Sequence, residues 1–284
     1  MSIRSIFAPN LFSGKVAIVT GGATGIGAAI AQELCHLGCD IVIASRNEEK
    51  LKAAAKKMQE DPQMKGRIYT TKCNIRSEGD VINLMTSTIE KYGKIDYLIN
   101  NGGGQFLSGA ENITAKGWHA VVETNLTGTF YCCKHAYLTW MQEHGGSIVN
   151  IITDMWKGYT FMAHSSAARA GVDNLTKTLS LEWAGSGVRI NSVAPGTIYS
   201  ETAVANYADP AIFDEALQLQ PTGRLGKPEE ISAAVCFLLS PAAAYITGES
   251  LKVDGAQSLY TNFIRIPKHD NFPKWSWEQT KAKL

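Results

Sequence analysis

The sequence predicts an α/β fold with a single doubly wound, Rossmann-type parallel sheet and helices on both faces. From residue 15 to residue 254, short β-branched runs alternate with amphipathic segments of helical length. The runs show no alternation of apolar and polar residues, which is typical of strands buried on both faces. No Pro-rich or Ser-rich linker divides the chain, so one domain is expected.

The elements follow in order along the chain. Strands are expected at residues 15–20, 40–45, 67–73, 97–100, 147–152, 189–193 and 250–253, and helices at 26–37, 48–58, 80–92, 118–143, 167–184 and 228–239. Because a helix-length segment follows most of the strands, the strands should be parallel. We expect an N-terminal arm at 1–14, the nucleotide-binding domain at 15–258 and a polar tail at 259–284. Residues 196–226 interrupt the alternation and contain two prolines, so they should form a substrate loop beyond a strand end.

Composition excludes several classes of function. The net charge of +1 gives no electrostatic footprint for nucleic acid. No apolar stretch approaches the ~18 residues of a membrane span. Of the six cysteines, Cys35 and Cys39 lie one helical turn apart with no histidine partner at metal spacing. We expect free, buried thiols and no metal site.

A glycine-rich loop follows the first expected strand and opens a helix. It reads Thr20-Gly-Gly-Ala-Thr-Gly-Ile-Gly27. Glycines at this junction allow a tight turn and a close approach to a pyrophosphate, which then meets the helix N-terminus. The cofactor-binding residues predicted here are Gly21, Thr24, Gly25, Ile26 and Gly27.

The end of the second strand indicates which dinucleotide binds. NAD-binding folds place an acidic residue near this point, where it accepts hydrogen bonds from the ribose 2′-hydroxyl. Here the chain has Ser45 and Arg46 and no acid. A hydroxyl and a guanidinium suit a 2′-phosphate. The predicted cofactor is therefore NADPH.

Several motifs resemble the short-chain dehydrogenase/reductase family, over roughly residues 15–255. They are the Gly21-x-x-x-Gly25-x-Gly27 spacing, Asn100-Asn101-Gly102-Gly103, Asn125 in Glu-Thr-Asn-Leu-Thr-Gly, and Pro195-Gly196. The resemblance implies further cofactor contacts: Asn74 and Ile75 at the adenine, Asn101 and Gly102 at the adenosine side, Asn125, Pro195 and Gly196 in the signature motifs, and Ile198 over the nicotinamide amide. It also implies a homo-oligomer, as a tetramer.

The catalytic motif departs from the family. In this family a Tyr-x-x-x-Lys pair lies on the helix after the fifth strand, and here those positions hold Ser165 and Arg169. The family serine corresponds to Thr153. A second frame, eight residues later, offers Lys177 but Asp173 instead of tyrosine. Neither frame contains a phenol.

A missing phenol points to particular chemistry. Tyrosine protonates a ketone oxygen attached to the carbon that takes hydride. When the double bond of an enoyl thioester is reduced, charge instead develops on an oxygen three bonds away from that carbon. Asn125, Thr153 and Ser165 could donate hydrogen bonds to this enolate, and Arg169 could hold the nicotinamide ribose. Gln105 and Phe106 are the expected substrate contacts.

More local segments narrow the resemblance to reductases of acyl-CoA thioesters. Gly102–Phe106, His164-Ser165 and Ala168–Gly171 resemble the peroxisomal trans-2-enoyl-CoA reductases, and Ala282-Lys283-Leu284 is close to the Ser-Lys-Leu peroxisomal signal that an import receptor reads. The resemblance implies reduction of trans-2-enoyl-CoA in peroxisomes.

Two alternatives remain open. The first is 2,4-dienoyl-CoA reduction, in which a tyrosine on the loop after the fifth strand serves as acid; here that position holds Asp154. The second is an inactive NADPH-binding protein. No proton donor is assigned, and Tyr159 and Tyr199 are the nearest phenols along the chain.

Overall fold

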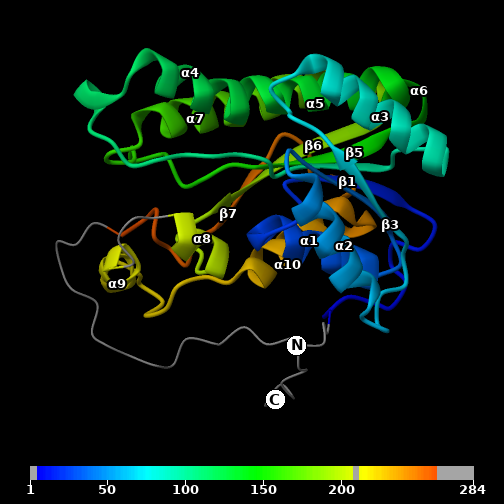
Figure 1. The fold of residues 1–284 in the computed structure, drawn as a ribbon, viewed down its shortest axis with the longest axis horizontal. Coiled ribbons are helices and arrows are strands. Elements are labelled where there is room, and N and C mark those ends of the chain that lie inside the picture. Colours follow the sequence, from blue (N-terminus) through cyan, green and yellow to red (C-terminus); the bar gives the residue numbers. More distant parts are fainter. Residues whose placement is uncertain (1–4, 207–210, 261–284) are drawn as a thin grey trace.

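The sheet of this protein has the strand order of a nucleotide-binding fold. The computed structural model describes residues 5–206 and 211–260. In this part of the chain, seven strands form one parallel sheet in the order β3-β2-β1-β4-β5-β6-β7 (Figure 1). The strands are β1 Val16–Thr20, β2 Asp40–Ser45, β3 Ile68–Lys72, β4 Tyr97–Asn100, β5 Gly146–Ile151, β6 Val188–Pro195 and β7 Ser250–Val253. The order reverses between β1 and β4, where such sheets open a crevice beyond their carboxyl ends.

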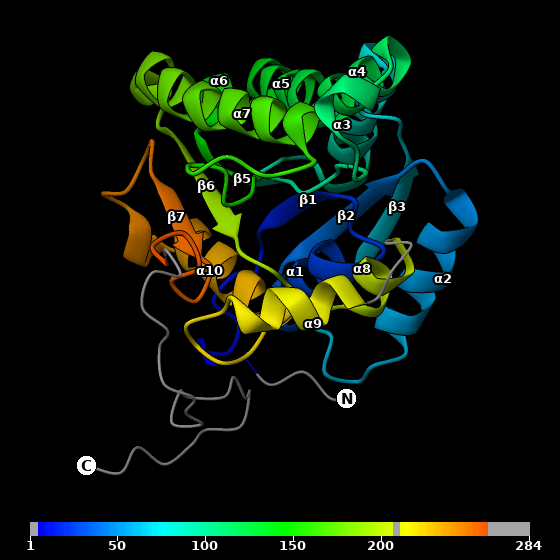
Figure 2. The same cartoon turned by 90° about the vertical axis from the view of Figure 1, so that its left-hand side faces the viewer.

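Helices cover both faces of the sheet (Figures 1 and 2). On one face lie α3 Glu78–Tyr92, α4 Ala115–Val122, α5 Gly128–Ala136, α6 Gln142–His144 and α7 Ala163–Glu182; on the other lie α1 Gly25–His36, α2 Glu48–Gln59 and α10 Pro228–Leu239. Two short helices, α8 Glu201–Asn206 and α9 Ala211–Gln218, follow β6. Single turns of 3₁₀ helix lie at Ala110–Asn112, Ala184–Ser186 and Pro241–Ala243.

Burial and capping explain these elements. Every residue of β1 is buried, and the strand pairs with β2 and β4 on its two sides. Helices α2, α3 and α4 begin where Asn47, Ser77 and Thr114 accept hydrogen bonds from backbone N–H groups of the first turn. Helix α3 ends at Gly93, whose φ of 77° requires glycine. The sheet is therefore a rigid base for the loops at its carboxyl edge.

Two helices differ from the prediction in ways that affect the site. The expected helix at 118–143 begins at Ala115 and runs to His144, and it includes π turns at Glu123–Thr127 and Tyr137–Met141. The expected helix at 167–184 begins at Ala163. Its first turn contains His164 and Ser165, whose polarity hid the helical periodicity.

Other expectations concern the chain as a whole. All six cysteines are buried and free, as predicted. The interrupted segment 196–226 contains the two short helices α8 and α9. Among the residues described, no helix is both long and apolar enough to cross a membrane.

Candidate active site

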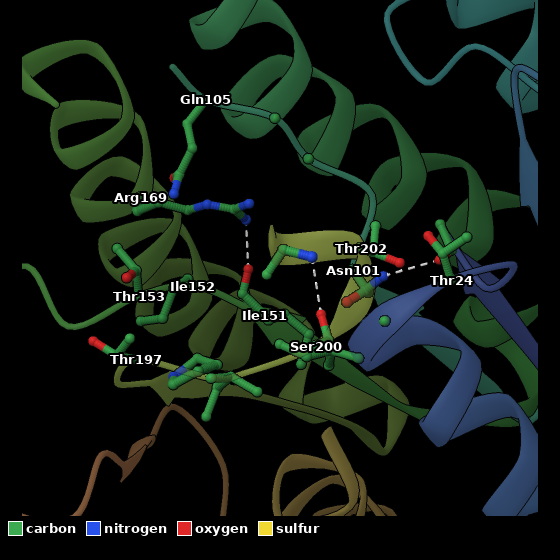
Figure 3. Close-up of a pocket in the computed structure, with 18 of the residues that line it drawn as sticks. Thr24, Asn101, Gln105, Ile151, Ile152, Thr153, Arg169, Thr197, Ser200 and Thr202 are labelled. Carbon is green, nitrogen blue, oxygen red and sulfur yellow. Dashed lines mark hydrogen bonds between the residues drawn. The ribbon is translucent and has the colours of Figure 1, made fainter. Parts of the chain in front are cut away.

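A cavity of about 620 Å³ lies at the carboxyl edge of the sheet. Its wall comes from the glycine-rich loop, the loops after β4 and β5, the start of α7, and the segment after β6. Of the residues predicted for the site, the wall includes Gly21, Thr24, Gly25, Ile26, Arg46, Asn101, Gly102, Gln105, Thr153, Arg169, Pro195, Gly196 and Ile198. The family motifs therefore converge on one cavity, which Figure 3 shows in close-up.

The glycine-rich loop has a backbone that only glycine adopts easily. Gly21 and Gly25 have φ values of 66° and 54°. The first turn of α1 carries no acidic residue, and Thr24 makes no side-chain cap. The N–H groups at this end of the helix are therefore not masked by a capping side chain or a nearby carboxylate, as an anion site requires.

Gly27 serves packing and does not line the cavity. A Cβ at this position would overlap the carbonyl oxygen of Gly21. Asn101 holds the same turn, because its Nδ2 donates to the carbonyls of Thr20 at 3.1 Å and Gly21 at 3.3 Å. The loop after β4 is thus tied to the glycine-rich loop, and the two form one wall.

The residues predicted at the adenosine end are only partly in the wall. Arg46 lines the cavity and forms no ion pair with any described residue. Ser45 does not line it, and its hydroxyl lies 3.5 Å from the carbonyl of Asn47. Asn74 and Ile75 are also outside the wall; the Oδ1 of Asn74 accepts from the N–H of Arg76, and Ile75 packs beside Gly102 and Gly128.

Arg169 is a buried cation in the wall. Its side chain extends from α7, and Nη1 donates to the carbonyl of Ile151 at the end of β5 (Figure 3). No carboxylate among the described residues pairs with it, and burial lowers the pKa of its guanidinium to about 10. A Cβ on Gly103 would overlap Nη2, so the guanidinium packs directly on that glycine. Its remaining donors are available to a polar ligand.

Asn125 lies behind the wall, in the first π turn. Its Oδ1 accepts from the N–H of Gly104 at 2.9 Å, and its Nδ2 donates to the carbonyl of Gly104, also at 2.9 Å. The side chain is fully buried. The π turn directs this amide at the loop after β4, so Asn125 fixes the loop, and it is absent from the cavity wall.

Ser165 and Phe106 are also outside the wall. The Ser165 hydroxyl donates to Oε1 of Gln105 at 2.8 Å, and the serine is 1% exposed. The Phe106 ring packs edge-to-face on His164, with 4.3 Å between ring centroids. Neither side chain reaches the cavity directly, whereas Gln105 does.

Of the other candidate acids and bases, one lines the cavity and the rest lie outside its wall. Tyr159, on the loop after β5, lines the cavity, but Tyr199 does not. Asp154 is half-buried outside the wall, and burial, followed by the charge of Asp254, raises the pKa of its carboxyl. In the second frame, Asp173 binds Lys177 and Ser250, each at 2.5 Å, and this pair is not in the wall.

Several wall residues were missed by the sequence analysis. They are Gly103, Gly104, Ile151, Ile152, Met162, Thr197, Ser200, Thr202, Ala203, Phe213 and Ala216. Most lie in the segment 196–226 or in the loop after β5. Their segments were recognisable, but irregular loops give no periodicity from which to tell which side chains point inward.

Comparisons with known proteins match most of the chain. The family model described as Enoyl-(Acyl carrier protein) reductase matches residues 21–256. A probable 2,4-dienoyl-CoA reductase of Bacillus subtilis (strain 168) is 36% identical over 249 residues, covering 86% of this chain and 97% of the relative. A peroxisomal 2,4-dienoyl-CoA reductase of Danio rerio is 38% identical over 255 residues, covering 88% and 83%.

Solved structures are also similar to this chain. A citronellol catabolism dehydrogenase of Pseudomonas aeruginosa PAO1 is 40% identical, with a TM-score of 0.80 over 90% of this chain and 100% of that one. A variant of actinorhodin polyketide ketoreductase with NADPH is 32% identical, with a TM-score of 0.81 over 89% and 100%. The fold, the converging motifs and these relatives together show that the chain is an oxidoreductase and belongs to the short-chain dehydrogenase/reductase family.

Proposed function

We propose that this protein uses NADPH to reduce the 2,3-double bond of trans-2-enoyl-CoA thioesters. One observation carries the proposal: the position of the family tyrosine holds Ser165, whose hydroxyl is bonded to Gln105 and lies outside the cavity wall. A site without a phenol at this position is poorly suited to protonating a ketone oxygen. Reduction of a conjugated thioester does not need that proton.

The residues present fit a bound NADPH. The glycine-rich loop and the unmasked start of α1 suit a diphosphate, and Arg46 at the cavity wall suits a 2′-phosphate. The buried guanidinium of Arg169 would hold the nicotinamide ribose hydroxyls. When bound, the cofactor would supply the hydride that goes to the β-carbon of the substrate.

The residues around Arg169 would manage the charge that hydride transfer creates. The electron pair of the double bond moves to the thioester oxygen, and the resulting enolate needs hydrogen-bond donors. Thr153 has a hydroxyl in the wall for this purpose. Asn125 would act indirectly, because it holds Gly104 and thereby the loop that carries Gln105.

Tyr159 is the proposed source of the last proton. The α-carbon must be protonated to complete the reaction, and serine, threonine and amide side chains are too weakly acidic to supply that proton. Tyr159 lines the cavity from the loop after β5. Its phenol would deliver the proton directly or through one water molecule.

A second candidate function is 2,4-dienoyl-CoA reduction. It is favoured by the names of relatives that are 36% and 38% identical to this chain. An assay of NADPH loss with crotonyl-, decenoyl- and hexadienoyl-CoA distinguishes the candidates. Turnover of the two enoyl thioesters supports the proposal; turnover of the dienoyl thioester alone supports the second candidate. If none of the three thioesters leads to NADPH oxidation, binding without catalysis is favoured.

Location and assembly complete the proposal. The tripeptide Ala282-Lys283-Leu284 lies outside the residues that the structure describes, as does the tail from residue 261. Relatives from Danio rerio and Rattus norvegicus are named as peroxisomal, whereas the Bacillus subtilis relative is bacterial. We propose that an import receptor binds this tripeptide and directs the enzyme to peroxisomes, and that the enzyme is a homo-oligomer.

A further inference from the structure

The loop after β4 is held at three consecutive residues. Gly104 exchanges two backbone hydrogen bonds with the Asn125 side chain, each 2.9 Å long. Gln105 accepts a hydrogen bond from Ser165, and Phe106 packs on the ring of His164. The Nδ1 of His164 in turn accepts from the N–H of Ser165 at 2.8 Å. The start of α7 and the first π turn therefore fix both the backbone and the side-chain direction of this loop.

Ser165 and Gln105 play unequal parts in this arrangement. Ser165 is 1% exposed and absent from the cavity wall, and its single hydroxyl hydrogen is donated to Oε1 of Gln105. Gln105 is exposed and lines the cavity. Because Oε1 faces Ser165, the carboxamide nitrogen with its two N–H donors faces away from it. Figure 3 shows the Gln105 side chain pointing toward Arg169.

The carboxamide lies directly beside the position of the missing phenol. Its oxygen lies 2.8 Å beyond the Ser165 hydroxyl, so the group stands where a longer side chain at position 165 would extend. A carboxamide can stabilise negative charge through its N–H groups, but it cannot release a proton at neutral pH. A donor of this kind suits an enolate that is protonated later on carbon.

We propose that Gln105 is, beside Thr153, a catalytic donor to the thioester oxygen and that Ser165 is a positioning residue, which acts only by holding Gln105. This inference rests on the proposed function for the identity of its ligand. The loop contacts supply the preorganisation that makes such a donor effective, since no reorientation is needed as charge develops. A tyrosine at position 165 would displace the carboxamide, so Ser165→Tyr should lower enoyl reduction.

The experiment uses an enolate probe that needs no turnover. Acetoacetyl-CoA ionises between its two carbonyls to an enolate with a near-ultraviolet absorption band. With NADP⁺ present, the band of the bound thioester is compared among the wild type, Ser165→Ala, Gln105→Met and the double variant. Methionine matches the length of glutamine without its donors. Ser180→Ala is the matched control, because Ser180 is a buried serine on α7 whose hydroxyl donates to the Lys177 carbonyl.

We expect the wild type to increase the enolate fraction, and each single variant to reduce that increase about tenfold or more. The double variant should have the same enolate fraction as Gln105→Met alone, and Ser180→Ala should have the enolate fraction of the wild type. In turnover of trans-2-enoyl-CoA, both single variants should lower kcat more than they raise KM.

Other results would overturn the inference. If the double variant loses as much of the enolate fraction as the product of the two single losses, Ser165 contacts the ligand itself. A wild-type band in Gln105→Met, which alters only an exposed loop side chain, would remove Gln105 as the donor. If the wild type binds acetoacetyl-CoA without an enolate band, the inference is also refuted. If the wild type binds no CoA thioester, the proposed function is refuted as well. If the losses in the enolate band do not add in the double variant but the wild type reduces no trans-2-enoyl-CoA, the proposed function alone is refuted.

Discussion

Arg169 combines burial, a positive charge and a place in the cavity wall. Burial lowers the pKa of its guanidinium to about 10, well below the ordinary range of arginine. The unfolded chain therefore binds this proton more tightly than the folded chain, and stability should rise with pH above about 10. At neutral pH the buried charge costs roughly 3 kcal/mol of folding free energy. Such an unfavourable placement suggests that Arg169 is retained for its ligand.

Arg169→Met tests that placement. Without cofactor, we expect the variant to be as stable as the wild type or up to about 2 kcal/mol more stable, because the removed burial cost exceeds the lost bond to Ile151. Its KM for NADPH should rise and its turnover should fall. Denaturant unfolding and a fluorescence titration with NADPH measure both effects. Destabilisation by more than about 1 kcal/mol with unchanged NADPH affinity would mean that Arg169 is purely structural.

Arg46 should determine cofactor choice. Because Ser45 and Arg46 stand at the end of β2 in place of an acid and Arg46 lines the cavity, NADPH should bind at least roughly tenfold more tightly than NADH. Arg46→Ala should remove most of that preference, about 1.4 kcal/mol per factor of ten. Arg67→Ala is the control, since Arg67 pairs with Asp40 at the opposite end of β2. Equal wild-type affinity for the two cofactors in fluorescence titrations contradicts the assignment.

At the scale of elements, adjacent glycines in the loop after β4 differ in what surrounds them. A Cβ at 103 would overlap Nη2 of Arg169, whereas a Cβ at 104 would meet nothing within 4 Å. Gly103→Ala should therefore displace the guanidinium and weaken NADPH binding about tenfold or more. Gly104→Ala should have a much smaller effect. Titration of both purified variants decides the matter, and similar losses in the two would show that Arg169 does not depend on this packing.

The sequence located the segments of the site better than the roles of single residues. The glycine-rich loop and the loop after β4 were both recognisable, because glycine and asparagine patterns report backbone constraints directly. The role of Ser165 was not, because its contact with Gln105 joins residues 60 positions apart. Tyr159 was also undecidable from sequence, since the loop after β5 has no period that would tell an inward side chain from an outward one.

For the whole molecule, the sheet was predictable because its central strands, such as β1 and β4, are short buried runs bounded by turns. The β1 and β4 residues that meet at the switch point, such as Val19 and Ile99, are completely buried and lie in such runs. Helix ends were less predictable, because α7 begins with a polar turn and the helix from Ala115 absorbs two π turns without a break. Both of these irregular regions hold the loop that carries Gln105.

Targeting is a property of the intact chain. A fluorescent protein fused to the N-terminus should concentrate in peroxisomes, because the fusion leaves Ala282-Lys283-Leu284 free for an import receptor. Deleting Leu284 should leave the fusion in the cytosol. Microscopy with a peroxisomal marker measures the location of the full-length fusion and of the fusion that lacks Leu284. A diffuse distribution of the full-length fusion would mean that the tripeptide is incidental.

The central claim is that this cavity stabilises a thioester enolate and does not protonate a ketone. The most direct test compares NADPH oxidation by the purified wild type with a trans-2-enoyl-CoA and with a 3-ketoacyl-CoA of the same chain length. We expect the enoyl thioester to be reduced at least about 100-fold faster, the scale that enolate donors contribute. Equal or faster reduction of the ketone would contradict the account.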